Sequence, residues 1–201
     1  MQVSVIIVNY NVQYFLEQCL YALTRAVKNI DAEIIVVDNC STDNSLKWLP
    51  QKFPGVKFIA SPENLGFAKA NNLGLTYAAG EFILFLNPDT LVGENSIQSV
   101  IAAMQKDERI GAAGIKMLDG SGNFLKESKR AFPSPLTSLF KLSGLAALFP
   151  RSPLFARYYL GHLDDNTSHE VDVLAGAFMM VKRHVLEEVG SFDEQFFMYG
   201  E

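Results

Sequence analysis

Four short apolar runs, separated by segments with helical spacing, constrain the fold of this chain most strongly. The runs lie at Val3–Val8, Ile34–Val37, Val56–Ala60 and Phe82–Leu86, and the first of them is rich in β-branched residues. Continuous runs of this kind are typical of strands that are buried on both faces. The pattern therefore predicts an α/β fold with a mostly parallel central sheet flanked by helices and a Rossmann-like N-terminal half.

The regular alternation stops near residue 90. We predict a helix near 95–105, a strand near 111–117 and a strand-like segment over 171–181. Prolines, glycines and aromatic residues without strand periodicity fill 133–168, which predicts an irregular excursion that carries one helix. A length of 201 residues suits a single core.

Charge and cysteine content narrow the function. The formal net charge is −5, and lysines and arginines are scattered along the chain, which argues against nucleic acid as a partner. A diphosphate ligand would need a metal ion, backbone N–H groups or a few placed cations. The two cysteines, Cys19 and Cys40, have no metal or disulfide spacing, so we expect a cytoplasmic protein.

The most membrane-like stretch, 136–149, is too short to span a bilayer and contains Lys141. Two interpretations stay open: a helix at the membrane interface, giving a peripheral contact at the inner face, or a helix packed on the domain or on a partner. A homodimer is also left open. The N-terminal apolar run is too short for a signal sequence, and we expect it to be a buried strand.

Polar residues follow the predicted strands at the edge where such sheets bind ligands. Asp89 follows the fourth strand in the segment Asn87-Pro88-Asp89, and Pro88 restricts Asn87 to extended geometry. Mg²⁺ or Mn²⁺ takes one or two protein carboxylates together with waters and phosphate oxygens. The alternative is that Asp89 only accepts a turn hydrogen bond. Asp38, at the end of the second strand, adds a second polar cluster and favours the metal interpretation.

Four segments carry a family resemblance: VIIVNYN at 5–11, VVDNCSTD at 36–43, NLGFAKANN at 64–72 and LNPD at 86–89. In order and spacing they resemble the family 2 glycosyltransferases of the GT-A (nucleotide-diphospho-sugar transferase) fold, nearest to a rhamnosyltransferase-like branch. The resemblance covers nearly the whole chain. It implies one domain over 1–201, with a nucleotide-binding half at 1–90 and an acceptor-side half at 91–201.

The resemblance also implies roles for single residues. The first two motifs would hold the base and ribose, the third would cover the nucleotide, and Asp89 would be the metal ligand. Asn72 would contact the nucleotide or a loop, with hydrogen bonding in the core as the alternative. The implied binding residues are Asn9, Tyr10, Asp38, Asn64, Gly66, Asn72 and Asn87.

Two features depart from the family pattern. The metal motif is usually Asp-x-Asp, whereas Asn87 here replaces the first carboxylate and would position the sugar or a metal-bound water. Glu201 matches the start of the family's Glu-Asp motif and is the candidate general base, but the chain ends there. We expect a chain truncated at its C-terminus with weak or no turnover. The small residues at 175–177 either leave room for a sugar ring or form a bulged core strand.

The expected function is an inverting glycosyltransferase in cell-surface polysaccharide synthesis. It would use Mg²⁺ or Mn²⁺ and transfer a sugar from dTDP-rhamnose or a UDP-hexose to a glycan or a lipid-linked acceptor. The alternative is a catalytically silent module that binds nucleotide sugars or supports assembly. The first strand is followed by neither a GxGxxG motif nor a lysine-bearing phosphate loop, which argues against a dinucleotide oxidoreductase and a nucleotidyltransferase.

Overall fold

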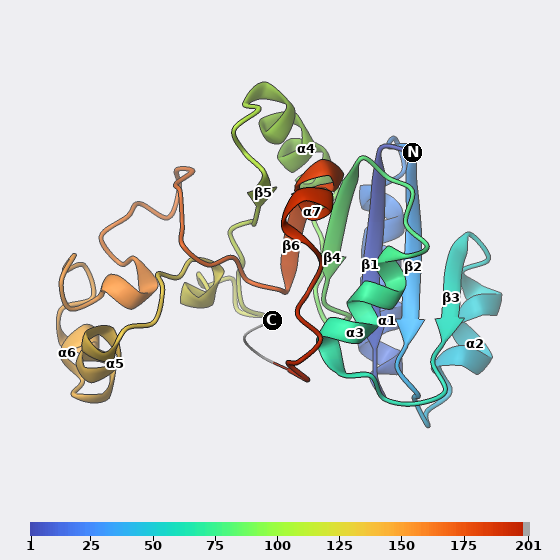
Figure 1. The fold of residues 1–201 in the computed structure, drawn as a ribbon, viewed down its shortest axis with the longest axis horizontal. Helices are drawn as coiled ribbons and strands as arrows, with labels where there is room; N and C mark the ends of the chain where they lie inside the picture. Colours follow the sequence, from blue (N-terminus) through green and yellow to red (C-terminus); the bar gives the residue numbers. More distant parts are fainter. Residues whose placement is uncertain (199–201) are drawn as a thin grey trace. The chain divides into compact units, whose positions relative to one another are not determined.

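The computed structural model describes residues 1–198, in which six strands form one sheet in the order β3-β2-β1-β4-β6-β5 (Figure 1). The first four strands are parallel, and β6 is antiparallel to both β4 and β5. The strands are β1 Val3–Asn9, β2 Ala32–Asp38, β3 Val56–Ala60, β4 Phe82–Leu86, β5 Ala112–Ala113 and β6 Phe178–Lys182. The predicted α/β class and the mostly parallel sheet are confirmed.

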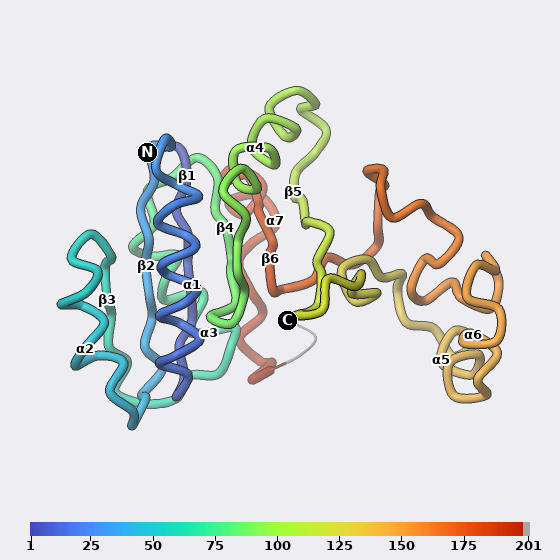
Figure 2. The backbone as a smooth tube through the Cα atoms, turned by 180° about the vertical axis from the view of Figure 1, so that it is seen from behind, coloured from blue at the N-terminus to red at the C-terminus, as the bar shows by residue number. Residues whose placement is uncertain are grey.

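Helices cover both faces of this sheet. The two views of the fold place α1 and α4 on one face and α3 and α7 on the other (Figures 1 and 2). Five helices belong with the sheet: α1 Gln13–Ala26, α2 Ser45–Lys52, α3 Gly66–Leu75, α4 Ser96–Lys106 and α7 Arg183–Val189. Because each parallel pair needs a crossover, the helices after β1, β2 and β3 return the chain to the same starting edge of the sheet.

The chain forms two compact units. Unit 1 comprises Met1–Ala113 and the segment that starts at Gly176, and it contains the whole sheet. Unit 2 comprises Gly114–Ala175. Unit 2 contains α5 and α6 and two short 3-10 helices: α5 Pro135–Leu142, α6 Leu145–Leu148, η1 Lys126–Ser128 and η2 Arg157–Tyr159. The predicted halves, 1–90 and 91–201, stay a prediction.

Several predicted boundaries were wrong in the second half. The strand predicted near 111–117 is only Ala112–Ala113, at the edge of the sheet, where it has β6 as its one neighbour. The strand-like segment over 171–181 enters the sheet only at Phe178, and the excursion at 133–168 holds two α-helices instead of one. Apolar spacing gives the conformation of a segment but not where its pairing partner begins.

Helix α3 packs closely against the sheet at Gly74. Gly74 of α3 lies against β1 and β2, and a Cβ atom there would be 2.5 Å from Cγ2 of Ile6 and 3.2 Å from Cγ2 of Val37. Both neighbours are fully buried. A glycine is needed at this position because any larger residue would overlap side chains of the central strands.

No helix among residues 1–198 is long and apolar enough to cross a membrane. The most membrane-like stretch of the sequence, 136–149, contains most of α5 and the whole of α6. The peripheral contact and the homodimer both stay predictions.

We predict that Gly74→Val lowers the free energy of unfolding by about 1–3 kcal/mol, because the added methyl groups overpack the interface between α3 and the sheet. The measurement is urea unfolding followed by circular dichroism. Gly55→Val is the matched control, since a Cβ at Gly55 has no atom within 4 Å. Equal effects of the two substitutions would contradict the packing argument.

Candidate functional site

A buried polar pair joins the carboxyl ends of β1 and β2. Asn9 lies opposite Asp38 in the parallel register, and its Nδ2 atom donates to Asp38 Oδ2 over 2.7 Å. Both residues are almost completely inaccessible to solvent. The second carboxylate oxygen of Asp38 accepts from the backbone N–H of Ser41. A buried carboxylate is tolerated only when its oxygens are hydrogen-bonded, so this network fixes the loop after β2.

Ser41 extends the network to the loop after β1. Its hydroxyl accepts from Asn9 Nδ2 over 3.1 Å and from the backbone N–H of Asn11 over 3.0 Å. Asn11 has a positive φ of 56°, which asparagine tolerates better than most residues. One atom of this cluster has no partner among the described residues: the buried Oδ1 of Asn9. It is an acceptor without a donor at the edge where α/β sheets bind ligands.

Asp43 connects the N-termini of two helices. Its Oδ2 accepts from the backbone N–H of Gln13, which begins α1, and its Oδ1 accepts from that of Ser45, which begins α2. Burial acts to raise the pKa of Asp43, but the hydrogen bonds from Ser45 and Gln13 outweigh it and hold the pKa below its ordinary value of 3.8. The side chain is therefore a carboxylate at neutral pH, which a helix N-terminus stabilises.

Asn39 secures the loop before α3. Its Nδ2 donates to Asn64 Oδ1 over 2.8 Å and to the carbonyl of Gly66, and its Oδ1 accepts from the backbone N–H of Leu65 over 2.8 Å. Asn64 Oδ1 also accepts from the N–H of Gly66. The predicted residues Asn64 and Gly66 are thus tied to the residue that follows Asp38.

Asn87 and Asp89 lie in a turn after β4. The turn is fixed through its backbone: Asn87 N–H donates to the carbonyl of Ala177, and Thr90 N–H donates to the carbonyl of Asn87. The Asn87 side chain is half-buried and has no hydrogen-bond partner within residues 1–198, whereas Asp89 is exposed. Both side chains are therefore free to meet a ligand at the same sheet edge as Asp38.

Cys19 of α1 lies beside this turn, with its Sγ atom 3.8 Å from the carbonyl oxygen of Asn87. Burial raises the pKa of the Cys19 thiol to about 12, and the nearby charge of Asp89 adds to the shift. A neutral thiol at physiological pH is a poor nucleophile and a poor metal ligand. Cys19 therefore packs beside the site without taking part in its chemistry.

Asn72 is engaged with the C-terminal segment. Its Nδ2 donates to the carbonyl of Phe192 and to Glu194 Oε1, and its Oδ1 accepts from the N–H of Phe192. Farther along, the carbonyl of Phe197 accepts from Phe67 N–H over 2.8 Å. The structure thus gives Asn72 a loop contact, and its nucleotide contact stays a prediction.

Gly66 begins α3 with a positive φ of 77°, and a Cβ there would lie 2.4 Å from the carbonyl oxygen of Phe197. The close approach that this glycine permits is made by the chain's own segment near Phe197. Any larger residue would push that segment away from α3.

The structure brings most of the predicted site residues to one edge of the sheet. Asn9, Asp38 and Asn87 end or follow neighbouring strands, and Tyr10 is half exposed beside them. The predicted base, Glu201, lies outside the described residues. Three further residues hold the site together, Asn39, Ser41 and Asp43, which the sequence places in the polar cluster at Asp38 but not among the predicted binding residues. Their position directly after Asp38 was the available signal.

The comparison with protein families decides the affiliation. Residues 4–190 match the model described as glycosyl transferase family 2. The chain belongs to this family. The predicted resemblance is confirmed, and with it the GT-A fold, which the structural comparison supports.

Two curated relatives are similar over almost the whole chain. One is the N-acetylglucosaminyl-diphospho-decaprenol L-rhamnosyltransferase of Mycobacterium tuberculosis, 29% identical over 98% of this chain and 66% of the relative. The other is a low-salt glycan biosynthesis hexosyltransferase of Haloferax volcanii, also 29% identical, over 98% of this chain and 58% of the relative. The chain thus spans about two thirds or less of their length.

Among solved structures, Staphylococcus aureus TarS is similar over 97% of this chain and 31% of its own, with a TM-score of 0.64 and 22% identity. A shorter form of TarS in complex with UDP-GlcNAc is 26% identical over 68% of this chain and 38% of its own, with a TM-score of 0.54. These likenesses support the GT-A fold.

We predict that Asn39→Ala lowers the free energy of unfolding by about 1–3 kcal/mol, because it removes the acceptor of the Leu65 N–H and the donor to Asn64 Oδ1 and to the carbonyl of Gly66. Amide exchange at 64–66 should become faster, as measured by hydrogen–deuterium exchange. Asn44→Ala is the control, because the Asn44 side chain makes no capping hydrogen bond. Unchanged exchange at 64–66 would contradict the role given to Asn39.

Proposed function

We propose that this chain forms the nucleotide-sugar-binding part of an inverting glycosyltransferase. The enzyme would transfer a sugar from dTDP-rhamnose or a UDP-hexose to a glycan or a lipid-linked acceptor in cell-surface polysaccharide synthesis. The observation that carries the proposal is the polar edge of a family 2 domain, where Asn9, Asp38, Asn87 and Asp89 end or follow adjacent parallel strands.

The buried polar pair suits the nucleoside end of the donor. The unpartnered Oδ1 of Asn9 would accept a hydrogen bond from the base or the ribose. Tyr10, with 48% of its surface exposed, offers a ring against which a base can pack. Asn64 and Gly66 are held next to the residue that follows Asp38 through their bonds to Asn39.

The residues that would lie at the diphosphate of the donor fit a cation that is bound jointly by the protein and by the diphosphate. Within residues 1–198, no group of three histidine, cysteine, aspartate or glutamate side chains could hold a metal ion by itself. One exposed carboxylate, Asp89, fits a Mg²⁺ or Mn²⁺ ion that takes its remaining ligands from diphosphate oxygens and water. When bound, such an ion neutralises the charge of the departing diphosphate. The free amide of Asn87 would orient the sugar or a water beside it.

Inversion at the anomeric carbon needs a carboxylate that takes the proton of the attacking acceptor hydroxyl. We assign this role to Glu201 on the basis of its position in the family motif. The small residues at 175–177 lie next to the Asn87 turn, because Ala177 accepts from Asn87 N–H and from Thr90 Oγ1. Small side chains there would leave space for a pyranose ring.

We extend the proposal to location. Both Cys19 and Cys40 are free thiols, which is compatible with a reducing cytoplasm. Nucleotide-sugar donors would then be bound on the same side of the membrane as the inner face at which a lipid-linked acceptor is presented.

We predict that UDP or dTDP binds with Mg²⁺ or Mn²⁺ and that Asp89→Ala weakens this binding at least tenfold, because the metal loses its protein carboxylate. The measurement is isothermal titration calorimetry with and without EDTA. Glu188→Ala is the matched control, since Glu188 is also an exposed carboxylate but lies on α7. This helix follows β6, which is antiparallel to β4 and ends beside the first residue of β4 and not beside its carboxyl end. Metal-independent binding that Asp89→Ala leaves unchanged would contradict the metal role.

We predict that Glu201→Gln lowers sugar transfer about a hundredfold or more, because general base catalysis contributes factors of this size. The variant is assayed in the protein at the full length of its reading frame, and its UDP or dTDP affinity should be unchanged. Glu188→Gln should transfer at the normal rate. If the unsubstituted full-length protein binds donor but neither transfers nor hydrolyses it, the binding-module alternative replaces the enzyme.

A further inference from the structure

Unit 2 contains a cavity of about 190 Å³ that none of the predicted site residues lines. Three of its lining side chains are cationic, Lys126, Lys129 and Arg151, and one is anionic, Asp165. A second hollow of about 330 Å³ shares three lining residues with it, Arg151, Gly161 and Asp165. Pockets that enclose a whole drug-sized ligand have a volume of at least about 300 Å³. The first hollow is smaller than this limit, and the second is close to it. The cavity therefore suits a single chemical group.

The cations of this cavity are not equivalent. Lys129 is already committed, because its Nζ pairs with Asp165 over 2.5 Å and donates to the carbonyl of Leu163 over 2.7 Å. The side chains of Lys126 and Arg151 have no ion pair or hydrogen bond in the part of the chain that the structure describes. Two uncompensated positive charges in a protein with a net charge of −5 favour an anionic ligand at this place.

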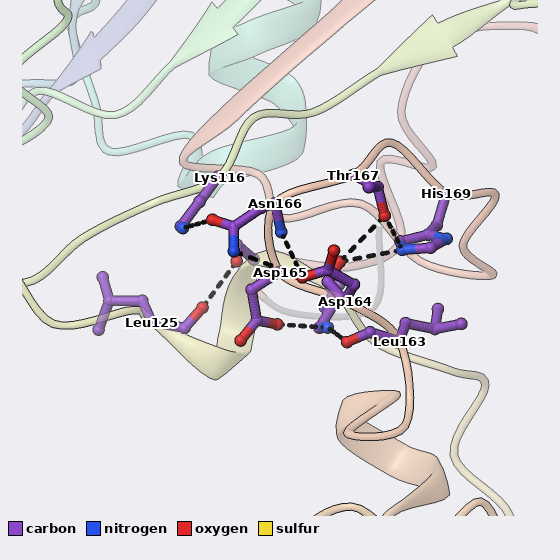
Figure 3. A network of polar contacts seen from close by, with 10 residues as sticks. Lys116, Leu125, Leu163, Asp164, Asp165, Asn166, Thr167 and His169 are labelled. Carbon is purple, nitrogen blue, oxygen red and sulfur yellow. Dashed lines mark hydrogen bonds and ion pairs between the residues drawn. The ribbon is translucent and has the colours of Figure 1, made fainter.

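The wall that carries Asp165 is held by its own polar network (Figure 3). Lys116 donates to Asn166 Oδ1 over 2.9 Å, and the Nε2 atom of His169 lies 2.8 Å from Thr167 Oγ1 and 2.9 Å from the carbonyl oxygen of Asp164. These bonds fix the backbone on both sides of Asp165. The Lys129–Asp165 pair is thus positioned before any ligand arrives, which lowers the cost of ordering the site.

The lining of the cavity also includes apolar residues, and one of them lies close in the sequence to exposed leucines. Ala146 of α6 lines the cavity, and Leu148, two residues later, is 69% exposed. The neighbouring helix α5 contacts α6 and exposes further leucines, of which Leu142 is 86% exposed. Exposed apolar side chains beside a small cationic cavity match an amphiphile that has an anionic end and an apolar chain.

We propose that the cavity of unit 2 binds the phosphate or diphosphate of the acceptor, with Lys126 and Arg151 as its ligands and the α5–α6 surface receiving the adjoining apolar chain. This inference rests on the proposed function, because it identifies the acceptor as a sugar joined to an apolar chain through phosphate. The same anionic chemistry occurs in a membrane headgroup, so the experiment has to separate the two sources.

The test is calorimetry of the whole chain in EDTA with three probes: inorganic pyrophosphate, geranyl diphosphate and geraniol. We expect geranyl diphosphate to bind at least tenfold more tightly than pyrophosphate, and geraniol to bind most weakly. Replacing both free cations, Lys126→Gln with Arg151→Gln, should weaken geranyl diphosphate binding tenfold or more. Arg157→Gln is the matched control, because it removes an exposed cation of unit 2 that does not line the cavity.

Two further arms separate this inference from the proposed function. Asp89→Ala should leave geranyl diphosphate binding unchanged, and the double variant should bind UDP or dTDP with metal as the unsubstituted chain does. If the unsubstituted chain binds geranyl diphosphate but neither UDP nor dTDP, the result contradicts the proposed function and supports the anion site in unit 2. If circular dichroism shows that the double variant does not fold, the single variant Lys126→Gln is used in its place, because Lys126 is exposed. This variant should also bind geranyl diphosphate more weakly than the unsubstituted chain.

Three results would overturn the cavity proposal. The first is geranyl diphosphate affinity that is equal in the double variant and the unsubstituted chain, and the second is an equal loss in Arg157→Gln. The third is that the unsubstituted chain sediments with phosphatidylglycerol vesicles but does not bind geranyl diphosphate, and that the double variant no longer sediments with the vesicles. That last outcome would assign the cations to the membrane surface instead.

Discussion

The hydrogen bond between Asn9 and Asp38 lies at the centre of the candidate site, because it joins two adjacent strands at the edge where α/β sheets generally bind ligands. Burying a carboxylate costs several kcal/mol unless its oxygens are satisfied. Asp38 meets that requirement with Asn9 on one oxygen and the N–H of Ser41 on the other. The loops after β1 and β2 are therefore fixed together.

Further order follows from this pair along the chain. Asn39, the next residue, holds Asn64 and Gly66 before α3, and Asp43 accepts from the first N–H groups of α1 and α2. The six residues from Asp38 to Asp43 thus position three helices relative to two strands. Such polar networks are costly when incomplete, which explains why short side chains with several hydrogen-bonding atoms are concentrated here.

The two ends of the donor that we propose for this site would meet different surroundings at this edge. The nucleoside side is buried and nearly saturated with internal bonds, whereas the turn after β4 offers an exposed carboxylate and an unbonded amide. The buried side favours a fixed orientation of the ligand. The exposed side leaves room for a cation, water and diphosphate, whose positions depend on one another.

The sequence by itself determined the first half of the fold and most of the candidate site. Phe82–Leu86 is a strand with the predicted bounds, because a buried parallel strand must be apolar on both faces. Val56–Ala60 also has its predicted bounds, but the prediction that it is buried on both faces was wrong, because it is the edge strand of the sheet and is only partly buried. Polar residues at the ends of those runs converge because parallel strands end at one edge.

Only the tertiary structure decided the partners of single side chains. Asn72 bonds to Phe192, 120 residues later, and the cavity of unit 2 gathers Lys126, Arg151 and Asp165 from separate loops and helices. No local pattern encodes such contacts, because they depend on how distant segments pack. Spacing along the chain determines local conformation, but the pairing of donors, acceptors and charges exists only after the segments have met in space.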